Sequence, residues 1–424
     1  MKTSPKKYFP IRTKTSCQLK WSWTSLFLDS GVSKTCHRTT EHKLTTENFK
    51  NFHNNKKVLE DRKKMLQGEW PEGNHCSHCR LIEENGGVSD RLHMIDIPDL
   101  YPEELDEDPQ SITVEPTVVE VFLSKLCNLG CLYCHAEVSS TINTENKRFD
   151  IPINFSPDLK RDFSPTKSNY SNLLTAFWEW FPNGFPKLKR FHILGGEPFL
   201  QKEVEIILDY IEEYPNPQCE LNIVTNLSYP KEKLEYFVAR FKKLLSRRKI
   251  KRVDITCSID CWGEEQEYTR YGINLDQWED NFNYLLEQRY LYLSINQTIT
   301  TLTVKSMPDL LKKLQEWRKK RPVHHAFSLV VSTDAYTHPT VLPGHIWKED
   351  CKKILDLMPR DTERNNKTWE YMKGSLDTML NSDGDPEKLK TLVQFLDEKD
   401  RRRNTNWRSV YPWLEEFVEQ QKDF

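Results

Sequence analysis

The stretch TVVEVFLSKLCNLGCLYC, residues 117–134, joins a strand-like run to a tight group of cysteines. The run at its start is mostly apolar and β-branched, which predicts a buried strand. Cys127, Cys131 and Cys134 follow on one short loop, where three thiolates can hold three corners of an iron–sulfur cubane. Gly130 permits the unusual backbone angles that such a loop needs. No fourth ligand belongs to this group, so one iron is left open, as in catalytic metal sites.

A structural zinc site, or chance spacing, is the alternative interpretation of this loop. Zinc held by three cysteines would need a fourth ligand nearby, and His135 is adjacent in sequence but strained as a ligand. We therefore favour the cluster.

Strands and helices alternate on the carboxyl side of this loop, which predicts an α/β fold with a parallel sheet. The expected strands are residues 117–123, 190–194, 220–225, 252–258, 292–300 and 326–332. The expected helices are residues 170–180, 201–214, 231–245, 275–288 and 308–318. Six such units predict a partial (β/α)6 TIM-like barrel whose chemistry lies at the carboxyl ends of its strands.

The chain is expected to have four parts. A cysteine-rich N-terminal domain (1–95) and an acidic, proline-rich linker (96–110) precede the barrel (111–334), and a helical C-terminal extension (335–424) follows it. A polar insert with three prolines, residues 137–167, interrupts the alternation. Loops this long without periodicity tend to be functional lids or disordered segments.

The cysteine loop resembles the CxxxCxxC motif of the radical S-adenosylmethionine (SAM) superfamily, with the aromatic Tyr133 before the last cysteine. The sequence Gly195-Gly196-Glu197-Pro198 ends the second expected strand and is similar to the GGEP motif of that superfamily. The resemblance implies that Gly195, Gly196 and Glu197 contact the SAM amino group. The residue types agree, because two glycines expose backbone and Glu197 is an acceptor for an ammonium. A simple turn in which Pro198 starts a helix is compatible with this role.

Other strand ends match the superfamily more weakly. Asn226 ends the third expected strand, while Ser258 and Asp260 resemble the SxDG pattern of peptide-modifying members. The resemblance implies that these three residues and Tyr133 bind the SAM cofactor. Cys261 stands where that pattern has glycine. Arg270 lies in EYTRYG, where the resemblance implies a contact with the SAM carboxylate or ribose. The alternative for Arg270 is an arginine on the surface of a helix.

The resemblance implies the chemistry as well. A [4Fe–4S] cluster passes one electron to SAM, and the resulting 5′-deoxyadenosyl radical abstracts hydrogen from a substrate. It also implies a one-electron donor such as flavodoxin or ferredoxin.

A second cysteine group precedes the barrel. Cys17, Cys36, Cys76 and Cys79 have a spacing that resembles SPASM and twitch domains, which implies a second, fully ligated [4Fe–4S] cluster. Family members usually carry this domain after the barrel, whereas here it comes first. The same four thiolates would suit zinc, which stays the alternative. The other four of the eleven cysteines are expected to be small buried hydrophobes: Cys219, Cys257, Cys261 and Cys351.

The formal net charge of −2 gives no global attraction to nucleic acid, membranes or acidic partners. A basic run at residues 242–252 is expected to be a solvated face, with a phosphate-binding patch as the lesser alternative. No apolar stretch reaches the length of a membrane span, and residues 1–15 lack the apolar segment of a signal peptide. The sequence therefore predicts a soluble, cytoplasmic protein.

Three functions follow from these features. The first is a radical SAM enzyme that modifies a peptide or protein. The second is a radical SAM enzyme acting on a nucleic acid or nucleotide, which the basic run allows but does not demand. The third, a non-enzymatic zinc-binding adaptor, leaves the GGEP motif and the strand–helix alternation unexplained.

Overall fold

The computed structural model describes residues 7–73, 75–84, 86, 88–95, 97–136, 138–149, 167–330 and 335–421. It contains two compact units, each drawn from several stretches of the chain. Unit 1 consists of Met1–Lys125, Phe163–Ile223 and Phe237–Val253. Unit 2 consists of Leu126–Asp162, Val224–Tyr236 and Asp254–Phe424. The expected four-part domain division stays a prediction.

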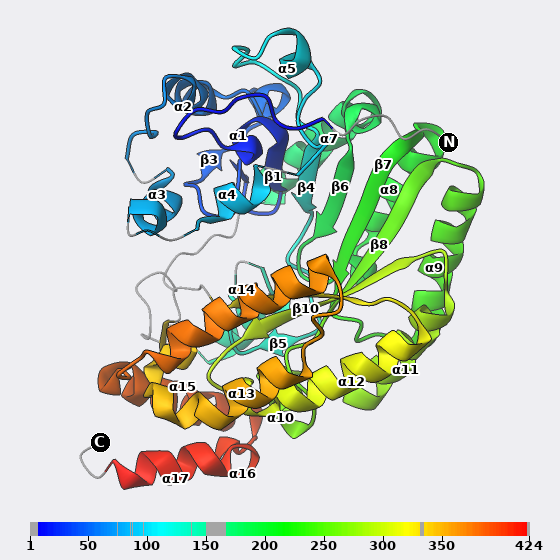
Figure 1. Cartoon of the computed structure of the whole chain (residues 1–424). Helices are drawn as coiled ribbons and strands as arrows, with labels where there is room; N and C mark the ends of the chain where they lie inside the picture. The colour runs from blue at the N-terminus through cyan, green and yellow to red at the C-terminus, as the bar shows by residue number, and fades with distance from the viewer. Residues whose placement is uncertain are drawn as a thin grey trace. The chain divides into compact units, whose positions relative to one another are not determined.

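The sheet of unit 1 has a parallel centre. Its strand order is β7-β6-β4-β1-β2-β3, and β4, β6 and β7 lie side by side in Figure 1. The parallel strands are β1 (Trp23–Phe27), β4 (Val118–Phe122), β6 (Arg190–Leu194) and β7 (Asn216–Thr225). The antiparallel edge is formed by β2 (Val32–Lys34) and β3 (His42–Lys43). The cysteine-rich N-terminal region therefore extends the parallel sheet through β1.

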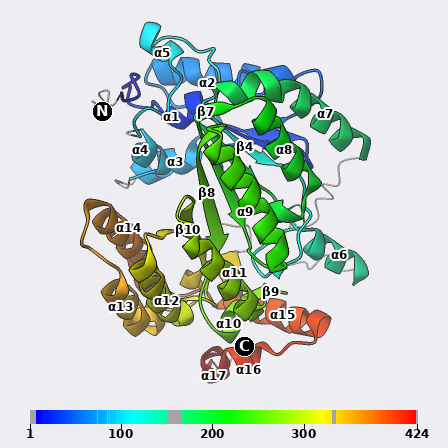
Figure 2. The same ribbon diagram turned by 90° about the vertical axis from the view of Figure 1, so that its right-hand side faces the viewer.

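The helices of unit 1 fall into two groups. The N-terminal group comprises α1 (Gln18–Ser22), η1 (Phe49–Asn51), α2 (Lys56–Leu66), α3 (Ser77–Glu84), α4 (Asp90–Met94) and α5 (Glu104–Glu107). The second group comprises α7 (Lys167–Gly184), η3 (Phe185–Lys187), η4 (Pro198–Leu200), α8 (Lys202–Glu213) and most of α9 (Lys231–Ser246). Figure 2 shows α7 and α8 on one side of the strands.

The acidic segment that we expected to be a linker is packed into a core. Leu100, Tyr101 and Leu105 are buried. The Tyr101 ring meets the ring of Phe9 edge-on, with their centroids 6.2 Å apart. Burial of these three side chains fixes the segment although its polar residues face solvent.

Unit 2 contains the rest of the parallel strands and a short antiparallel pair of strands. From residue 254 onward, β8 (Ile250–Ser258) pairs with β10 (Tyr292–Ile299), which pairs in turn with β11 (His324–Leu329). Separately, β5 (Gly130–Cys131) pairs antiparallel with β9 (Arg270–Tyr271). The insert begins with α6 (Ser140–Arg148), and its residues 150–166 lie outside the described part of the chain.

The remaining helices of unit 2 include the C-terminal region, which is helical as expected. They are α10 (Glu264–Thr269), α11 (Leu275–Glu287), η5 (Val304–Ser306), α12 (Met307–Lys320), η6 (Ala335–Thr337), η7 (Pro339–Val341), η8 (Gly344–Trp347), α13 (Lys348–Leu357), α14 (Glu363–Leu380), α15 (Pro386–Arg403), α16 (Trp407–Val410) and α17 (Pro412–Gln420). Figure 2 shows α12, α13 and α14 together.

The predicted α/β class is confirmed. All six expected strands and all five expected helices are present, with ends that shift by a few residues. Residues 331–332, at the end of the last expected strand, lie outside the described part. None of the helices in the described ranges combines the length and the apolarity that crossing a bilayer requires.

Candidate functional site

The cysteine loop is fastened on both sides within unit 2. Cys131 pairs with Arg270 where β5 meets β9, and the backbone N–H of Leu132 donates to the carbonyl of Thr269 at 2.9 Å. On the other side, the Ser139 hydroxyl donates to the Leu129 carbonyl at 3.0 Å. These bonds hold the loop in one conformation between two distant segments of the chain.

The three thiols of the loop are gathered in one place. Cys131 is coupled electrostatically to Cys127, and Cys134 is coupled to both. Burial raises the pKa of Cys131 to about 11 and also raises that of Cys134. The arrangement thus brings together three soft sulfur ligands, of which Cys131 is buried and the other two are half-buried.

Nitrogen donors point at these sulfurs. The Leu129 backbone N–H lies 3.5 Å from Cys127 Sγ, and Asn226 Nδ2 lies 3.8 Å from the same atom. Arg270 Nη1 lies 4.0 Å from Cys131 Sγ. Donors around the sulfurs stabilise thiolate ligands and tune iron–sulfur clusters. The residues therefore fit a cluster at Cys127, Cys131 and Cys134.

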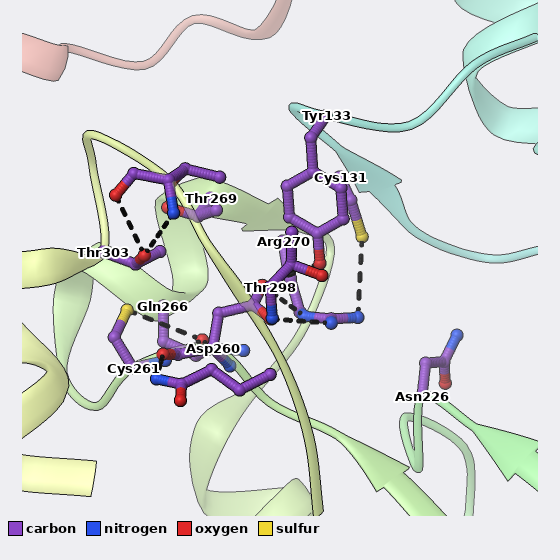
Figure 3. A network of polar contacts seen from close by, with 12 residues as sticks. Cys131, Tyr133, Asn226, Asp260, Cys261, Gln266, Thr269, Arg270, Thr298 and Thr303 are labelled. Atoms are coloured by element: carbon purple, nitrogen blue, oxygen red, sulfur yellow. Dashed lines mark hydrogen bonds and ion pairs between the residues drawn. The ribbon is translucent and has the colours of Figure 1, made fainter. Parts of the chain in front are cut away.

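A buried ion pair stands beside the loop (Figure 3). Arg270 donates two hydrogen bonds to the Asp260 carboxylate, from Nε to Oδ2 at 2.8 Å and from Nη2 to Oδ1 at 2.9 Å. The Tyr133 hydroxyl donates to Asp260 Oδ2 at 2.7 Å, and the Thr298 backbone N–H donates to Oδ1 at 2.9 Å. Arg270 is only 6% exposed and lies in β9, so its interpretation as a surface helix arginine is wrong.

The turn after β8 shows how Cys261 replaces the expected glycine. The backbone N–H groups of Asp260 and Cys261 both donate to Gln266 Oε1 at 3.0 Å. The left-handed backbone position falls on Gly263, with φ of 105°, and not on Cys261. A side chain at position 261 is therefore tolerated.

The remaining sites of this unit differ in how closely they approach the loop. Asn226 lies next to the cysteine loop, because its Nδ2 also donates to Asn128 Oδ1 at 2.9 Å. Ser258 ends β8 and is 8% exposed, in register with Asn296 of β10. Its predicted SAM contact stays a prediction. Sequence reasoning missed Asn128, Gln266 and Thr298, since single polar residues carry no pattern.

The GGEP turn belongs to unit 1. Gly195 has φ of +136°, and a Cβ there would lie 2.8 Å from the Ser124 carbonyl oxygen, so only glycine fits. Glu197 is fully buried and caps η4 by accepting the Phe199 backbone N–H at 3.1 Å. Pro198 starts this short helix, which confirms the turn interpretation. The contact of Gly195, Gly196 and Glu197 with SAM stays a prediction.

Helix α15 contributes a buried basic group that the sequence did not reveal. Glu145 of α6 pairs with Lys399 and with Arg403, whose Nε lies 2.8 Å from Glu145 Oε2. The Arg403 guanidinium lies 4.5 Å from the Tyr271 ring. A Cβ on Gly130 would lie 3.0 Å from Arg403 Nη2. The C-terminal extension therefore reaches the backbone of the cysteine loop.

The four N-terminal cysteines also come together, in unit 1. Cys17 is coupled electrostatically to Cys36 and Cys76, and both Cys36 and Cys76 are coupled to Cys79. Burial raises the pKa of Cys17 to about 12 and that of Cys76 to about 11.

Two donors accompany these thiols. The Arg38 backbone N–H lies 3.4 Å from Cys36 Sγ, and Lys20, paired with Asp61 at 3.0 Å in the interior, is coupled to Cys76 and Cys36. A thiol set with a backbone donor and a buried cation fits a cluster. Within the described ranges, no group of three or more His, Cys, Asp and Glu residues is arranged to hold a single metal ion.

Four cations of the basic run are paired with carboxylates of unit 1. Glu212 pairs with Lys243 at 2.8 Å and with Arg247, while Glu220 pairs with Lys251 and Arg252, each at 3.1 Å. These pairs support the solvated-face interpretation of the run.

Comparisons with known proteins give a limited result. No protein-family model and no curated protein matches the chain. It is similar to a solved structure of native anSMEcpe with bound AdoMet, at 13% identity and TM-score 0.35, over 61% of this chain and 62% of that one. It is also similar to Streptococcus suis SuiB bound to S-adenosylmethionine, at 16% identity and TM-score 0.38, over 78% of this chain and 68% of that one. A third is SuiB bound to precursor peptide SuiA, at 13% identity and TM-score 0.38, over 84% of this chain and 70% of that one. At these values the likenesses carry no functional argument.

Proposed function

We propose that this protein is a radical SAM enzyme. The observation that carries the proposal is the cysteine loop itself: Cys127, Cys131 and Cys134 are gathered and approached by nitrogen donors. Three thiolates leave one iron of a [4Fe–4S] cluster open for SAM. The GGEP turn, whose Gly195 and buried Glu197 adopt a defined geometry, supports the same assignment.

The residues of the chain have separable tasks in this proposal. When bound, the cluster supplies the electron that cleaves SAM to methionine and a 5′-deoxyadenosyl radical. Asp260 holds Arg270 and Tyr133, and Arg270 directs Nη1 toward Cys131 Sγ. Asn226 donates toward Cys127, and Cys131 is buried while Cys127 and Cys134 are half-buried.

We further propose a peptide or protein substrate and a flavodoxin- or ferredoxin-type electron donor. The SxD residues Ser258 and Asp260 support a peptide, through the resemblance to peptide-modifying members. A nucleic-acid substrate has less support, because four cations of the basic run are paired with Glu212 and Glu220. None of the eleven cysteines forms a disulfide in the described chain, which fits a reducing compartment and supports a cytoplasmic location.

The test is reductive SAM cleavage. Anaerobically reconstituted protein with dithionite should convert SAM to 5′-deoxyadenosine, and replacing any one of Cys127, Cys131 or Cys134 with Ala should abolish the product. Cys351→Ala is the matched control, because Cys351 is a buried thiol of α13 outside both cysteine groups. Product formed by the triple Ala variant would show the assignment to be wrong. Mass spectrometry of cellular peptides and RNA, with and without the protein, would identify the substrate.

A further inference from the structure

A row of polar side chains crosses four parallel strands of unit 1. Ser25 of β1 is in register with Glu120 of β4, Glu120 with His192 of β6, and His192 with Asn222 of β7. Residues in register on neighbouring parallel strands project from the same face of a sheet. Nothing in the proposed SAM chemistry uses this polar row.

The polar row lies on the face opposite the helices. Along β6, Phe191 and Ile193 alternate with His192 and are fully buried. The Phe191 ring packs edge-on against Phe181 of α7 and Phe185 of η3, with centroids 5.7 Å apart in both pairs. In a (β/α) barrel the face that helices do not cover is the barrel interior, and the site lies at the carboxyl-terminal end of that interior.

Glu120 is the centre of the polar row. Its Oε2 accepts from the Ser25 hydroxyl at 2.6 Å and lies 3.0 Å from His37 Nε2. Its Oε1 faces His192 Nδ1 at 4.0 Å, beyond hydrogen-bond distance. A separation of this size leaves room for a donor to bridge the two atoms.

Two of the side chains around Glu120 are partly exposed to solvent. The Glu120 side chain is 4% exposed, whereas those of His192 and His37 are 18% and 55% exposed. Burial on its own would raise the pKa of Glu120. The neighbouring His37, His192 and Ser25 side chains outweigh burial and hold that pKa below its ordinary value. An ionised acceptor is therefore held beside two partly exposed imidazoles.

An apolar row lies next to the polar one, toward the carboxyl ends of the strands. Phe27, Phe122 and Leu194 are in register there. The rings of Phe27 and Phe122 are stacked, with centroids 4.1 Å apart. Two residues along a strand span about 7 Å, which is the scale of an extended lysine or arginine side chain. Leu194 directly precedes Gly195, so the apolar row ends at the GGEP turn.

We infer that the two rows bind a cationic side chain of the peptide substrate, a lysine or an arginine. The carboxylate of Glu120 takes the ammonium or guanidinium, and the aromatic pair covers the alkyl stem, as amphipathic cations require. A charge-assisted hydrogen bond to a buried carboxylate is among the stronger polar contacts that a protein offers. This inference rests on the proposed function, since it names the substrate class of that enzyme.

The test uses two charged probes and one neutral probe. N-acetyl-lysine methylamide and N-acetyl-arginine methylamide are titrated into the full-length, cluster-reconstituted protein without SAM, and binding is followed by saturation-transfer NMR. N-acetyl-norleucine methylamide has a similar stem and no charge. We expect saturable binding of the charged probes and about tenfold weaker binding of the neutral one, equivalent to about 1.4 kcal/mol.

The matched variants are Glu120→Gln and Glu220→Gln. Both remove one carboxylate charge from unit 1, but Glu220 is paired with two permanent cations, Lys251 and Arg252, whereas Glu120 faces only histidines. Binding of the charged probes should weaken about tenfold in Glu120→Gln and stay unchanged in Glu220→Gln. Circular dichroism and thermal melting confirm that both variants fold. Equal weakening in both variants, or equal binding of the neutral probe, would overturn the inference.

The two proposals fail separately. Probe binding needs neither SAM nor reductant. Wild-type protein that forms 5′-deoxyadenosine but binds no charged probe would contradict this inference alone. Wild-type protein that binds the probes but cleaves no SAM would contradict the proposed function.

Discussion

Asp260 is the residue on which the polar network of the site depends. It is fully buried, and its carboxylate holds the buried Arg270, the Tyr133 hydroxyl and the Thr298 backbone. Replacing Asp260 with Ala would leave the guanidinium of Arg270 buried and unpaired. Breaking a buried pair in this way costs about 3–5 kcal/mol. We therefore expect Asp260→Ala to lower the free energy of unfolding by about that amount, measured by denaturant titration.

An exposed ion pair provides the control for Asp260. Lys373 and Asp377 pair at 2.6 Å on α14, and each side chain is 45% exposed. Asp377→Ala removes a carboxylate from a solvated pair, so we expect a much smaller loss than in Asp260→Ala. Similar losses in the two variants would mean that burial of the Asp260–Arg270 pair has no special energetic weight.

Glu197 caps a helix in the structure and is also predicted to bind SAM, and one substitution distinguishes these two roles. Its carboxylate caps η4, and Glu197→Gln keeps an oxygen that can accept the Phe199 backbone N–H. If the charge of Glu197 also binds the SAM ammonium, affinity for SAM should fall about tenfold to a hundredfold, since a hydrogen bond to a charged group contributes about 1.5–3 kcal/mol. Calorimetry with SAM measures this. Unchanged affinity would leave Glu197 as a helix cap alone.

Among the elements, α15 has an electrostatic role that its position in the chain does not suggest. Arg403 is 3% exposed in its side chain, lies against Gly130 of the cysteine loop and is coupled to Cys131. A buried cation favours the more negative, reduced form of a nearby cluster. Arg403→Gln should therefore lower the reduction potential of the SAM-binding cluster, by about 60 mV, which is a tenfold change for one electron.

The control for Arg403 lies on the same helix. Arg401 is 54% exposed and pairs with Glu398, so Arg401→Gln removes an equal charge from a solvent-exposed position. A redox titration followed by electron paramagnetic resonance would compare the two variants. The same potential in Arg403→Gln as in the wild type would mean that Arg403 only anchors Glu145 and the loop.

For the whole molecule, the open question is what the N-terminal cysteines hold. We predict that Cys17, Cys36, Cys76 and Cys79 bind a second cluster, so iron analysis should give about eight irons per chain, about four for each [4Fe–4S] unit. A variant without Cys127, Cys131 and Cys134 should keep half of that iron and its Mössbauer signal. One tightly held zinc with only four irons would instead establish the zinc alternative.

Much of the fold could be predicted because its signals are local. The strand at β4 and the helices α8, α9 and α11 were predicted from apolar periodicity over short windows. The spacing of Cys127, Cys131 and Cys134 was informative for the same reason, since a short loop forces its residues together. The acidic segment at residues 100–105 shows the limit of this reasoning, because its overall polarity concealed three buried side chains.

The sequence by itself determined the alternation of strands and helices, the cysteine loop and the glycine turn at Gly195. Only the tertiary structure decided that Arg270 is buried against Asp260, that Arg403 reaches the loop, and that Glu120 is aligned with His192. Those pairings join segments that are separated by ten, by more than two hundred and fifty, and by about seventy residues. Periodicity is set by the backbone within a few residues. Strand register and buried charge pairing instead depend on the burial and packing of distant segments, which no local pattern records.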